Sequence, residues 1–257
     1  MVAAADPQLH ARCLELVGDD AFARAGDDTR FAQPAIFCAS LAGGIHRTVS
    51  EPAIYAGHSL GELTALTAAG VLSVDDGLAL VVERGRLMAQ AAAEQGDGGM
   101  TALLKATPEQ AQSIADAHDV VVANDNAPGQ LVLSGSKDRL DAAAQAARAE
   151  GLRVLRLDVA GAFHSPAMAA AAAGFADALA DVHLHDAQVP VFSCATGRPF
   201  DDVRAQLAAA LTAPVLWRQT LLGLQQAGVS TFVDAGPGQI LAGTVTRTIG
   251  QQVGARA

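Results

Sequence analysis

Hydrophobic positions along the chain follow two different spacings. Apolar residues three and four positions apart predict helices over 6–17 and 34–44, and another helix that follows 57–61 and stops at Gly70. Short apolar runs such as 53–56 predict buried strands instead. Helices that alternate with short buried strands are typical of an α/β protein with a mostly parallel sheet.

Capping residues predict where several of these helices begin. Asp6 can accept a hydrogen bond from a free backbone N–H, and Pro7 suits the first helical position. Ser73 and Asp76 have the spacing of a capping box before the apolar positions of 78–87. We therefore expect helices at both places, with the first one near the start of this sequence.

The spacing of hydrophobic positions changes after the glycine-rich segment 96–99. The residues that follow predict strands at 100–104, 120–123, 131–134 and 153–157, and helices that start at Thr107 and span 137–150. A turn-rich segment, 124–130, separates the two middle strands. The order βαββαβ is typical of a ferredoxin-like subdomain. We expect this subdomain at 97–158, inserted between two halves of a larger α/β domain formed by 1–96 and 159–257.

The second half of the larger domain repeats the alternation. Its predicted elements are a helix that starts at Ser165-Pro166, a strand at 189–193, helices at 201–211 and 215–226, a strand at 231–234, and a final helix after the glycine turn 236–238.

Composition excludes several classes of protein. Of the 257 residues, 51% are hydrophobic, which allows a large core. No apolar run approaches the roughly 18 residues of a membrane span, and the N-terminal residues lack the pattern of a secretory signal. The three cysteines have no paired spacing, which argues against disulfides or a metal site. A formal net charge of -10 without a Lys/Arg cluster argues against nucleic acid. We expect a soluble, cytoplasmic monomer with no membrane or nucleic-acid partner.

The segment 57–61, GHSLG, matches the pattern G-x-S-x-G between a predicted strand and a predicted helix. A nucleophile elbow requires this context, because flanking glycines allow a sharp turn that exposes the hydroxyl of Ser59. The start of the following helix directs N–H groups to the place where an oxyanion would form. The alternative is an ordinary glycine-rich turn between a strand and a helix.

A serine nucleophile needs a base, and His164 is the strongest candidate among the seven histidines. It follows the last subdomain strand and directly precedes a capped helix start, and the order serine then histidine agrees with α/β hydrolases. A lone histidine is more often structural, and no acidic residue is indicated as a third member. His58 is expected to point away from the hydroxyl of Ser59.

Arg84 lies in the middle of an apolar helix, within ALVVERGRLM. Two interpretations remain open from the residues alone. The side chain can extend to the surface and pair with a neighbour, or its guanidinium can bind a carboxylate in a two-pronged fashion.

These motifs together resemble the malonyl-CoA:acyl carrier protein transacylases of fatty acid synthesis and the acyltransferase domains of polyketide synthases. The resemblance runs in order along nearly the whole chain. Its blocks are TRFAQPAIFCAS at 29–40, AGHSLGELTAL at 56–66, LVVERGRLM at 80–88, NDNAPGQLVLSG at 124–135, AFHSPAM at 162–168, PVLW at 214–217 and DAGPGQIL at 234–241.

The resemblance implies a role for each of these residues. Ser59 is acylated, His164 is the base and Arg84 binds the malonyl carboxylate. A backbone N–H of Leu60 helps to hold the oxyanion. Phe163 matches the malonyl-selective form of its block, in which a phenyl ring leaves little room for an extra methyl group. A backbone carbonyl from the loop before 214 orients the histidine.

The implied fold is a hydrolase-like parallel-sheet domain with an inserted ferredoxin-like (βαββαβ) subdomain. The implied activity is ping-pong transfer of a malonyl group from malonyl-CoA to the phosphopantetheine thiol of acyl carrier protein, with no cofactor and no metal. The carrier protein would need a basic surface, for which Arg148, Arg153 and Arg156 are candidates. The alternatives are a polyketide-pathway acyltransferase, a serine acyl hydrolase and an inactive relative that binds carrier proteins.

One block of the family pattern is absent from this sequence. Family members carry a strand and a G-Q-G-S-Q loop before the first helix, and that loop contributes to the oxyanion hole. This sequence starts in the following element. The resemblance therefore implies either a shortened version of a complete enzyme, which we favour, or a variant that lacks one oxyanion donor and one central strand.

Overall fold

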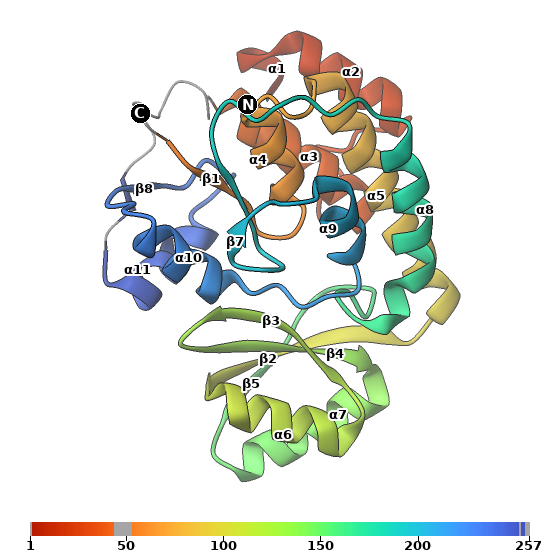
Figure 1. Cartoon of the computed structure of the whole chain (residues 1–257). Helices are drawn as coiled ribbons and strands as arrows, with labels where there is room; N and C mark the ends of the chain where they lie inside the picture. Colours follow the sequence, from red (N-terminus) through yellow and green to blue (C-terminus); the bar gives the residue numbers. More distant parts are fainter. Residues whose placement is uncertain (1, 44–52, 252, 255–257) are drawn as a thin grey trace.

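The computed structural model describes residues 2–43, 53–251 and 253–254. A layer of helices covers one side of the larger part of the molecule (Figure 1). It consists of α1 (Val2–Ala5), α2 (Pro7–Val17), α3 (Thr29–Ala42), α4 (Gly61–Ala68), α5 (Val74–Gln95) and α8 (Ala169–Ala180). These helices contribute most of the largest hydrophobic cluster, in which Phe37, Leu78 and Phe175 are fully buried.

Side-chain caps set the first turns of several helices, as the sequence predicts. Asp6 accepts a hydrogen bond from the backbone of Leu9, and Ser73 accepts one from the backbone of Asp76. The predicted start of α3 at 34 is wrong. Asp28 accepts a hydrogen bond from the backbone of Arg30, so the helix begins at Thr29 and contains Pro34 in its interior. Its predicted end at 44 lies outside the described residues.

Short strands lie beside this helical layer. β1 (Tyr55–Ala56) pairs in parallel with β6 (Val191–Ser193), and β6 pairs antiparallel with β7 (Arg198–Pro199). β8 (Phe232–Val233) pairs in parallel with β9 (Val253–Gly254) as a separate sheet. The fold is therefore α/β with mixed sheets. β1, β6 and β8 are shorter than the strands predicted at 53–56, 189–193 and 231–234, because their backbone ladders span only two or three residues.

A second unit, also called the β2–β5 unit below, lies at the bottom of Figure 1. It contains β2 (Gly98–Ala106), α6 (Pro108–His118), β3 (Val121–Ala127), β4 (Gly129–Ser136), α7 (Lys137–Ala149) and β5 (Arg153–Arg156). The strands form one antiparallel sheet in the order β3-β4-β2-β5. α6 and α7 cover one face with their own hydrophobic cluster, and the capping box of Thr107 and Gln110 begins α6.

The segment 124–130 is not the open turn that its composition predicts. β3 continues to Ala127 and β4 begins at Gly129, so the two strands form a tight hairpin. Backbone pairing of β3 with β4, and of Asn124 with Val215, overrides the turn preference of Asn and Asp.

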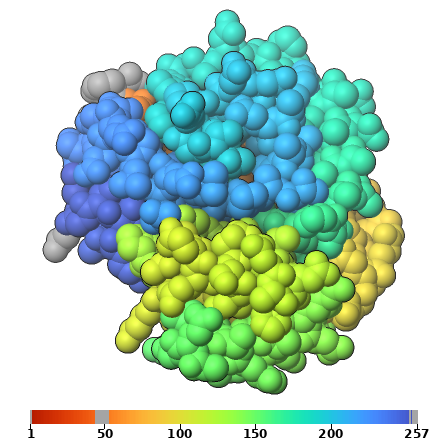
Figure 2. All heavy atoms as spheres, turned by 60° about the horizontal axis from the view of Figure 1, so that its bottom comes forward, coloured from red at the N-terminus to blue at the C-terminus, as the bar shows by residue number. Residues whose placement is uncertain are grey.

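After the second unit, the rest of the chain returns to the larger part of the molecule, which contains the layer of helices. It forms the short helix η1 (Pro166–Met168) and then, after α8, the helices α9 (Val203–Ala209), α10 (Trp217–Gln226) and α11 (Ile240–Ile249). Figure 2 shows the β2–β5 unit lying against these C-terminal segments. Within the described part of the chain, no helix is both long and apolar enough to cross a membrane.

Candidate active site

Ser59 stands at a sharp turn between β1 and α4. Its φ of 53° lies in the left-handed region, which is uncommon for a residue other than glycine. A Cβ on Gly57 would lie 1.9 Å from the carbonyl carbon and oxygen of Gly61, so the turn can close only with glycine at this position. The predicted strand–turn–helix context of an elbow is therefore present.

His164 lies within hydrogen-bond distance of the serine. Its Nε2 is 2.8 Å from Ser59 Oγ, and its Nδ1 is 2.9 Å from the carbonyl oxygen of Ala210 and 3.1 Å from that of Ala213. A carbonyl oxygen only accepts, so Nδ1 carries the proton and donates to both carbonyls. Nε2 of the neutral ring is then free to accept a proton from the Ser59 hydroxyl.

Burial keeps this histidine neutral. The side chain lies in the interior, and this burial lowers the pKa of His164 to about 3, with further lowering by the charges of Arg84 and His58. The two carbonyl contacts act in the opposite direction. The imidazole is therefore uncharged at neutral pH and can act as a base.

Arg84 reaches the same hydroxyl from α5. The residue is 4% exposed, its Nη2 donates to Ser59 Oγ at 3.0 Å, and its Nη1 donates to Gln33 Oε1 at 2.6 Å. Burial lowers the pKa of Arg84 to about 10, so the guanidinium keeps its charge at neutral pH. No carboxylate among the described residues forms an ion pair with it. Of the two sequence interpretations, the structure supports the buried guanidinium.

Three further residues that sequence reasoning missed surround the nucleophile. Gln33 is buried on α3 and holds Arg84. Glu62 is buried on α4, where its Oε1 accepts hydrogen bonds from Ser193 Oγ at 2.9 Å and from the backbone N–H of Cys194 at 2.7 Å. Burial raises the pKa values of both Glu62 and Cys194. A polar residue within an apolar helical stretch, as at 33 and 62, is a signal that could have identified two of them.

Cys194, the third of these residues, contacts the backbone of the elbow. Ser59 N–H donates to Cys194 Sγ at 3.3 Å, and Cys194 is fully buried. The neighbouring His58 has its Nε2 2.8 Å from Asn126 Oδ1 of β3, so its ring is engaged with the second unit. The predicted residue Leu60 directly precedes α4, and Phe163 packs between the large cluster and the apolar face of the β2–β5 sheet.

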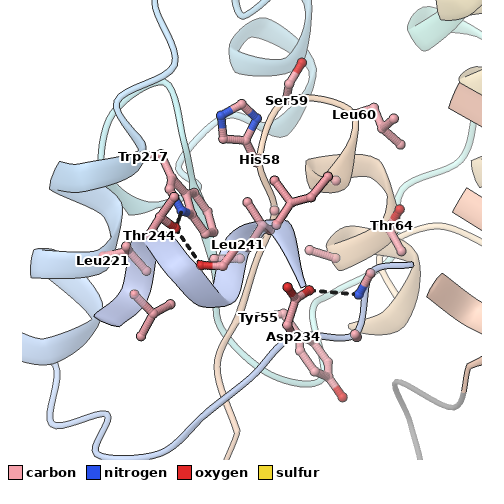
Figure 3. A pocket seen from close by; sticks show the side chains of 18 of the residues that line it. Tyr55, His58, Ser59, Leu60, Thr64, Trp217, Leu221, Asp234, Leu241 and Thr244 are labelled. Atoms are coloured by element: carbon pink, nitrogen blue, oxygen red, sulfur yellow. Dashed lines mark hydrogen bonds between the residues drawn. The ribbon is translucent and has the colours of Figure 1, made fainter. Parts of the chain in front are cut away.

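A cavity with a volume of about 1180 Å³ is lined by Ser59, His164 and Arg84, together with Gln33, His58, Leu60, Asn126 and Phe163. Figure 3 shows His58 and Ser59 at one end and Tyr55 and Asp234 at the other, with Trp217 and Leu221 along one wall. Among the described residues, no cluster of three or more His, Cys, Asp or Glu side chains is arranged to hold a metal ion. The site can therefore offer a hydroxyl, a neutral base and a buried cation to one ligand.

Comparison with known proteins identifies the family. The profile of the acyl transferase domain matches residues 17–257. A malonyl CoA-acyl carrier protein transacylase of Synechocystis sp. is 38% identical over 226 residues, which cover 86% of this chain and 75% of that protein. The corresponding protein of Bacillus subtilis is 35% identical over 227 residues, covering 84% of this chain and 71% of that one.

A solved structure agrees with these relatives. The malonyl-CoA:acyl carrier protein transacylase of Xanthomonas oryzae pv. oryzae superposes with a TM-score of 0.89 at 34% sequence identity, covering 98% of this chain and 87% of that chain. The match of profile, sequence and fold over nearly all of the chain leads to one conclusion: this chain belongs to the acyl transferase domain family.

Proposed function

We propose that the chain transfers a malonyl group from malonyl-CoA to the phosphopantetheine thiol of acyl carrier protein through a Ser59 acyl-enzyme. The observation that carries this proposal is the buried guanidinium of Arg84, whose Nη2 lies 3.0 Å from the same hydroxyl that His164 contacts at 2.8 Å. The names of the relatives in Synechocystis and Bacillus subtilis support the choice of donor and acceptor.

In the first half-reaction, His164 Nε2 accepts the proton of the Ser59 hydroxyl while Oγ attacks the thioester carbonyl carbon. The carbonyl oxygen becomes an oxyanion, towards which the backbone N–H of Leu60 at the start of α4 would donate. The C–S bond then breaks, coenzyme A leaves as the thiol with the proton from His164, and the malonyl ester remains on Ser59. No cofactor or metal takes part in these steps.

Arg84 supplies selectivity for a donor with a free carboxylate. Its guanidinium is fully enclosed, charged and without an ion-pair partner among the described residues, so an entering carboxylate would gain a charged, two-pronged contact. Gln33 fixes one side of the guanidinium, which leaves Nη2 on the side of Ser59 for the substrate. Phe163 would limit the room beside the acyl group and favour malonyl over a branched donor.

In the second half-reaction, the thiol of the carrier protein attacks the Ser59 ester with His164 again as the base. The acidic carrier protein would dock on basic side chains. Arg148, Arg153 and Arg156 lie on the outside of the β2–β5 unit and remain our proposal for this contact, although Arg156 already pairs with Asp141 at 3.3 Å.

We interpret 1–96 and 159–257 as a hydrolase-like core and 97–158 as a ferredoxin-like subdomain. The strand order β3-β4-β2-β5 and the two helices on one face of that sheet support the second assignment.

The intact mass of the protein after incubation with malonyl-CoA tests the proposal. We expect an increase of one malonyl group, absent in Ser59→Ala and removed when carrier protein is added. Removal of the group by water at the same rate without carrier protein would make the protein a serine acyl hydrolase. Absence of the adduct in a folded sample would contradict the acyl-enzyme.

A further inference from the structure

The end of β3 is tied to α10 by an ion pair unlike the others in the molecule. Arg218 Nε lies 2.9 Å from Asp125 Oδ1 and 3.0 Å from Oδ2, and Nη2 lies 2.6 Å from Oδ2. The two side chains are 27% and 9% exposed, whereas both partners are at least 35% exposed in every other ion pair of the described residues. A largely buried, two-pronged pair of this kind fixes geometry more firmly than a surface pair.

The backbone makes the same connection beside this ion pair. Val215 N–H donates to the carbonyl of Ala123 at 2.8 Å, and Asp125 N–H donates to the carbonyl of Val215 at 2.8 Å. The segment 210–216 is therefore held against β3 at Val215, and its C-terminal end is held through Arg218 in the first turn of α10.

The segment 210–216 also carries both carbonyls that contact the base. His164 Nδ1 donates to Ala210 at 2.9 Å and to Ala213 at 3.1 Å, and Ala213 lies only two residues before Val215. His164 itself has a φ of 55°, a left-handed conformation that needs support from its surroundings. Movement of the segment away from β3 would therefore break the hydrogen bonds that Nδ1–H donates, and the ring would lose its fixed orientation.

We propose that Asp125 and Arg218 are positioning residues for His164. Their ion pair holds the segment 210–216 so that the two carbonyls keep the proton on Nδ1 and aim Nε2 at Ser59 Oγ. The second unit thus acts on the base through β3. This inference rests on the Ser59–His164 pair of the proposed function, but it does not depend on the identity of the acyl donor.

A consequence for protonation follows from the same geometry. Burial is the largest cause of the low pKa of His164. A segment that loosens and admits water would raise this pKa towards its ordinary value, so that the base becomes protonated at a higher pH. Arg84 and His58 are the charged or titratable groups that act on His164, and both remain unchanged in the variants below.

The test is the rate at which a fluorophosphonate labels Ser59, measured from pH 4 to pH 8. This reagent reacts with an activated serine without malonyl-CoA or carrier protein, so its outcome is independent of the malonyl assignment. The variants are Arg218→Gln, Arg218→Lys and Asp125→Asn. Arg139→Gln is the matched control, because it breaks an exposed ion pair with Asp119 in the unit that also contains Asp125.

We expect Arg218→Gln and Asp125→Asn to label about 10- to 100-fold more slowly at neutral pH, because a small displacement of a catalytic group has effects of this size. Arg218→Lys keeps the positive charge but cannot form the two-pronged contact, so its labelling rate should be intermediate. The acid limb of the rate should move to higher pH in the slow variants only. Wild-type rates and pH profiles in all three variants would overturn the inference.

Thermal unfolding and circular dichroism of each variant separate positioning from folding. A purely structural role would lower the folded fraction, and with it the labelled fraction, but would leave the rate constant and pH profile of the folded protein unchanged. That result would also overturn the inference. If Arg218→Gln does not fold, Arg218→Lys and Asp125→Asn decide the question by the same rate and pH criteria.

Discussion

One hydroxyl, one neutral imidazole and one buried guanidinium meet at Ser59, and each depends on its surroundings for its chemical state. His164 is neutral because it is buried, while Arg84 stays charged although it is buried. Gln33 occupies one side of the guanidinium with a hydrogen bond of 2.6 Å. At the scale of residues, the site therefore places a positive charge next to the nucleophile, and we propose that this charge recognises a negative group of the substrate.

Substitution of Arg84 tests this recognition. We expect Arg84→Ala to lower the rate of acyl-enzyme formation from malonyl-CoA roughly 100-fold, because loss of a charged hydrogen-bonding group costs about 3 kcal/mol. Transfer from acetyl-CoA, which has no carboxylate, should not fall in parallel. Intact mass against time with both donors measures the ratio.

Arg86→Ala is the matched control for this prediction. Arg86 lies on the same helix, but its side chain is 54% exposed and pairs with Glu83 at 2.7 Å. The control should behave as the wild type with both donors. An equal loss of malonyl and acetyl transfer in Arg84→Ala would instead assign a general role to this arginine.

At the scale of elements, the elbow between β1 and α4 depends on close contact of its own backbone. Gly57 lies against Gly61, and hydrogen bonds of 3.0 Å from Gly61 N–H to His58 and from Glu62 N–H to Ser59 close the turn. The strain of Ser59 at a φ of 53° is stored in this turn. The elbow is thus a rigid connection and not a flexible loop.

A pair of glycine substitutions tests the elbow. Gly57→Ala places a Cβ 1.9 Å from backbone atoms of Gly61, and we expect a loss of more than about 3 kcal/mol in unfolding free energy or failure to fold. Gly61→Ala meets no atom within 4 Å and should change the unfolding free energy by less than about 0.5 kcal/mol. Urea unfolding measures both, and similar stabilities for the two variants would refute the packing argument.

At the scale of the whole molecule, the site lies where the β2–β5 unit meets the larger part. One face of the sheet packs on α6 and α7, whereas the opposite face carries an apolar cluster with Phe163 packed against it. Asn126 of the same sheet contacts His58, and Asp125 contacts Arg218. The cavity that contains Ser59 is therefore lined by residues of both parts of the molecule, and His164 is buried beside it.

This burial predicts how stability depends on pH. In the unfolded chain His164 binds a proton near its ordinary pKa of about 6.5, whereas burial in the folded protein lowers the pKa to about 3. Between these values the unfolded state binds more protons, so stability falls as the pH falls below about 6.5. From pH 7.5 to pH 5.5, this residue should contribute a loss of about 1.4 kcal/mol.

Urea unfolding of the wild type and of His164→Gln at the two pH values isolates this contribution. Burial also lowers the pKa of His58, which adds to the pH dependence of both proteins in the same direction. The wild type should lose about 1.4 kcal/mol more than the variant. Equal pH dependence in the two proteins would show that His164 is not held neutral by burial.

Local sequence determined the starts of three helices, α2, α5 and α6, and the elbow. The caps Asp6, Ser73 and Thr107 act on backbone groups within three residues of themselves, so they can be recognised without the rest of the fold. The elbow likewise depends on Gly57, two residues before Ser59. The fold class and the candidates Ser59 and His164 could therefore be predicted from the residues, whereas a role for Arg84 came only from the family resemblance.

Tertiary structure alone decided whether Arg84 reaches the surface or the nucleophile, and which carbonyls hold His164. Ala210 and Ala213 lie 46 and 49 residues from His164, and no local pattern marks a carbonyl that accepts such a bond. Residues 124–127 extend β3 because they pair with β4 and, at Asn124, with Val215, against their own turn preference. Short-range hydrogen bonds depend on neighbouring residues, whereas burial and long-range pairing depend on how distant elements pack.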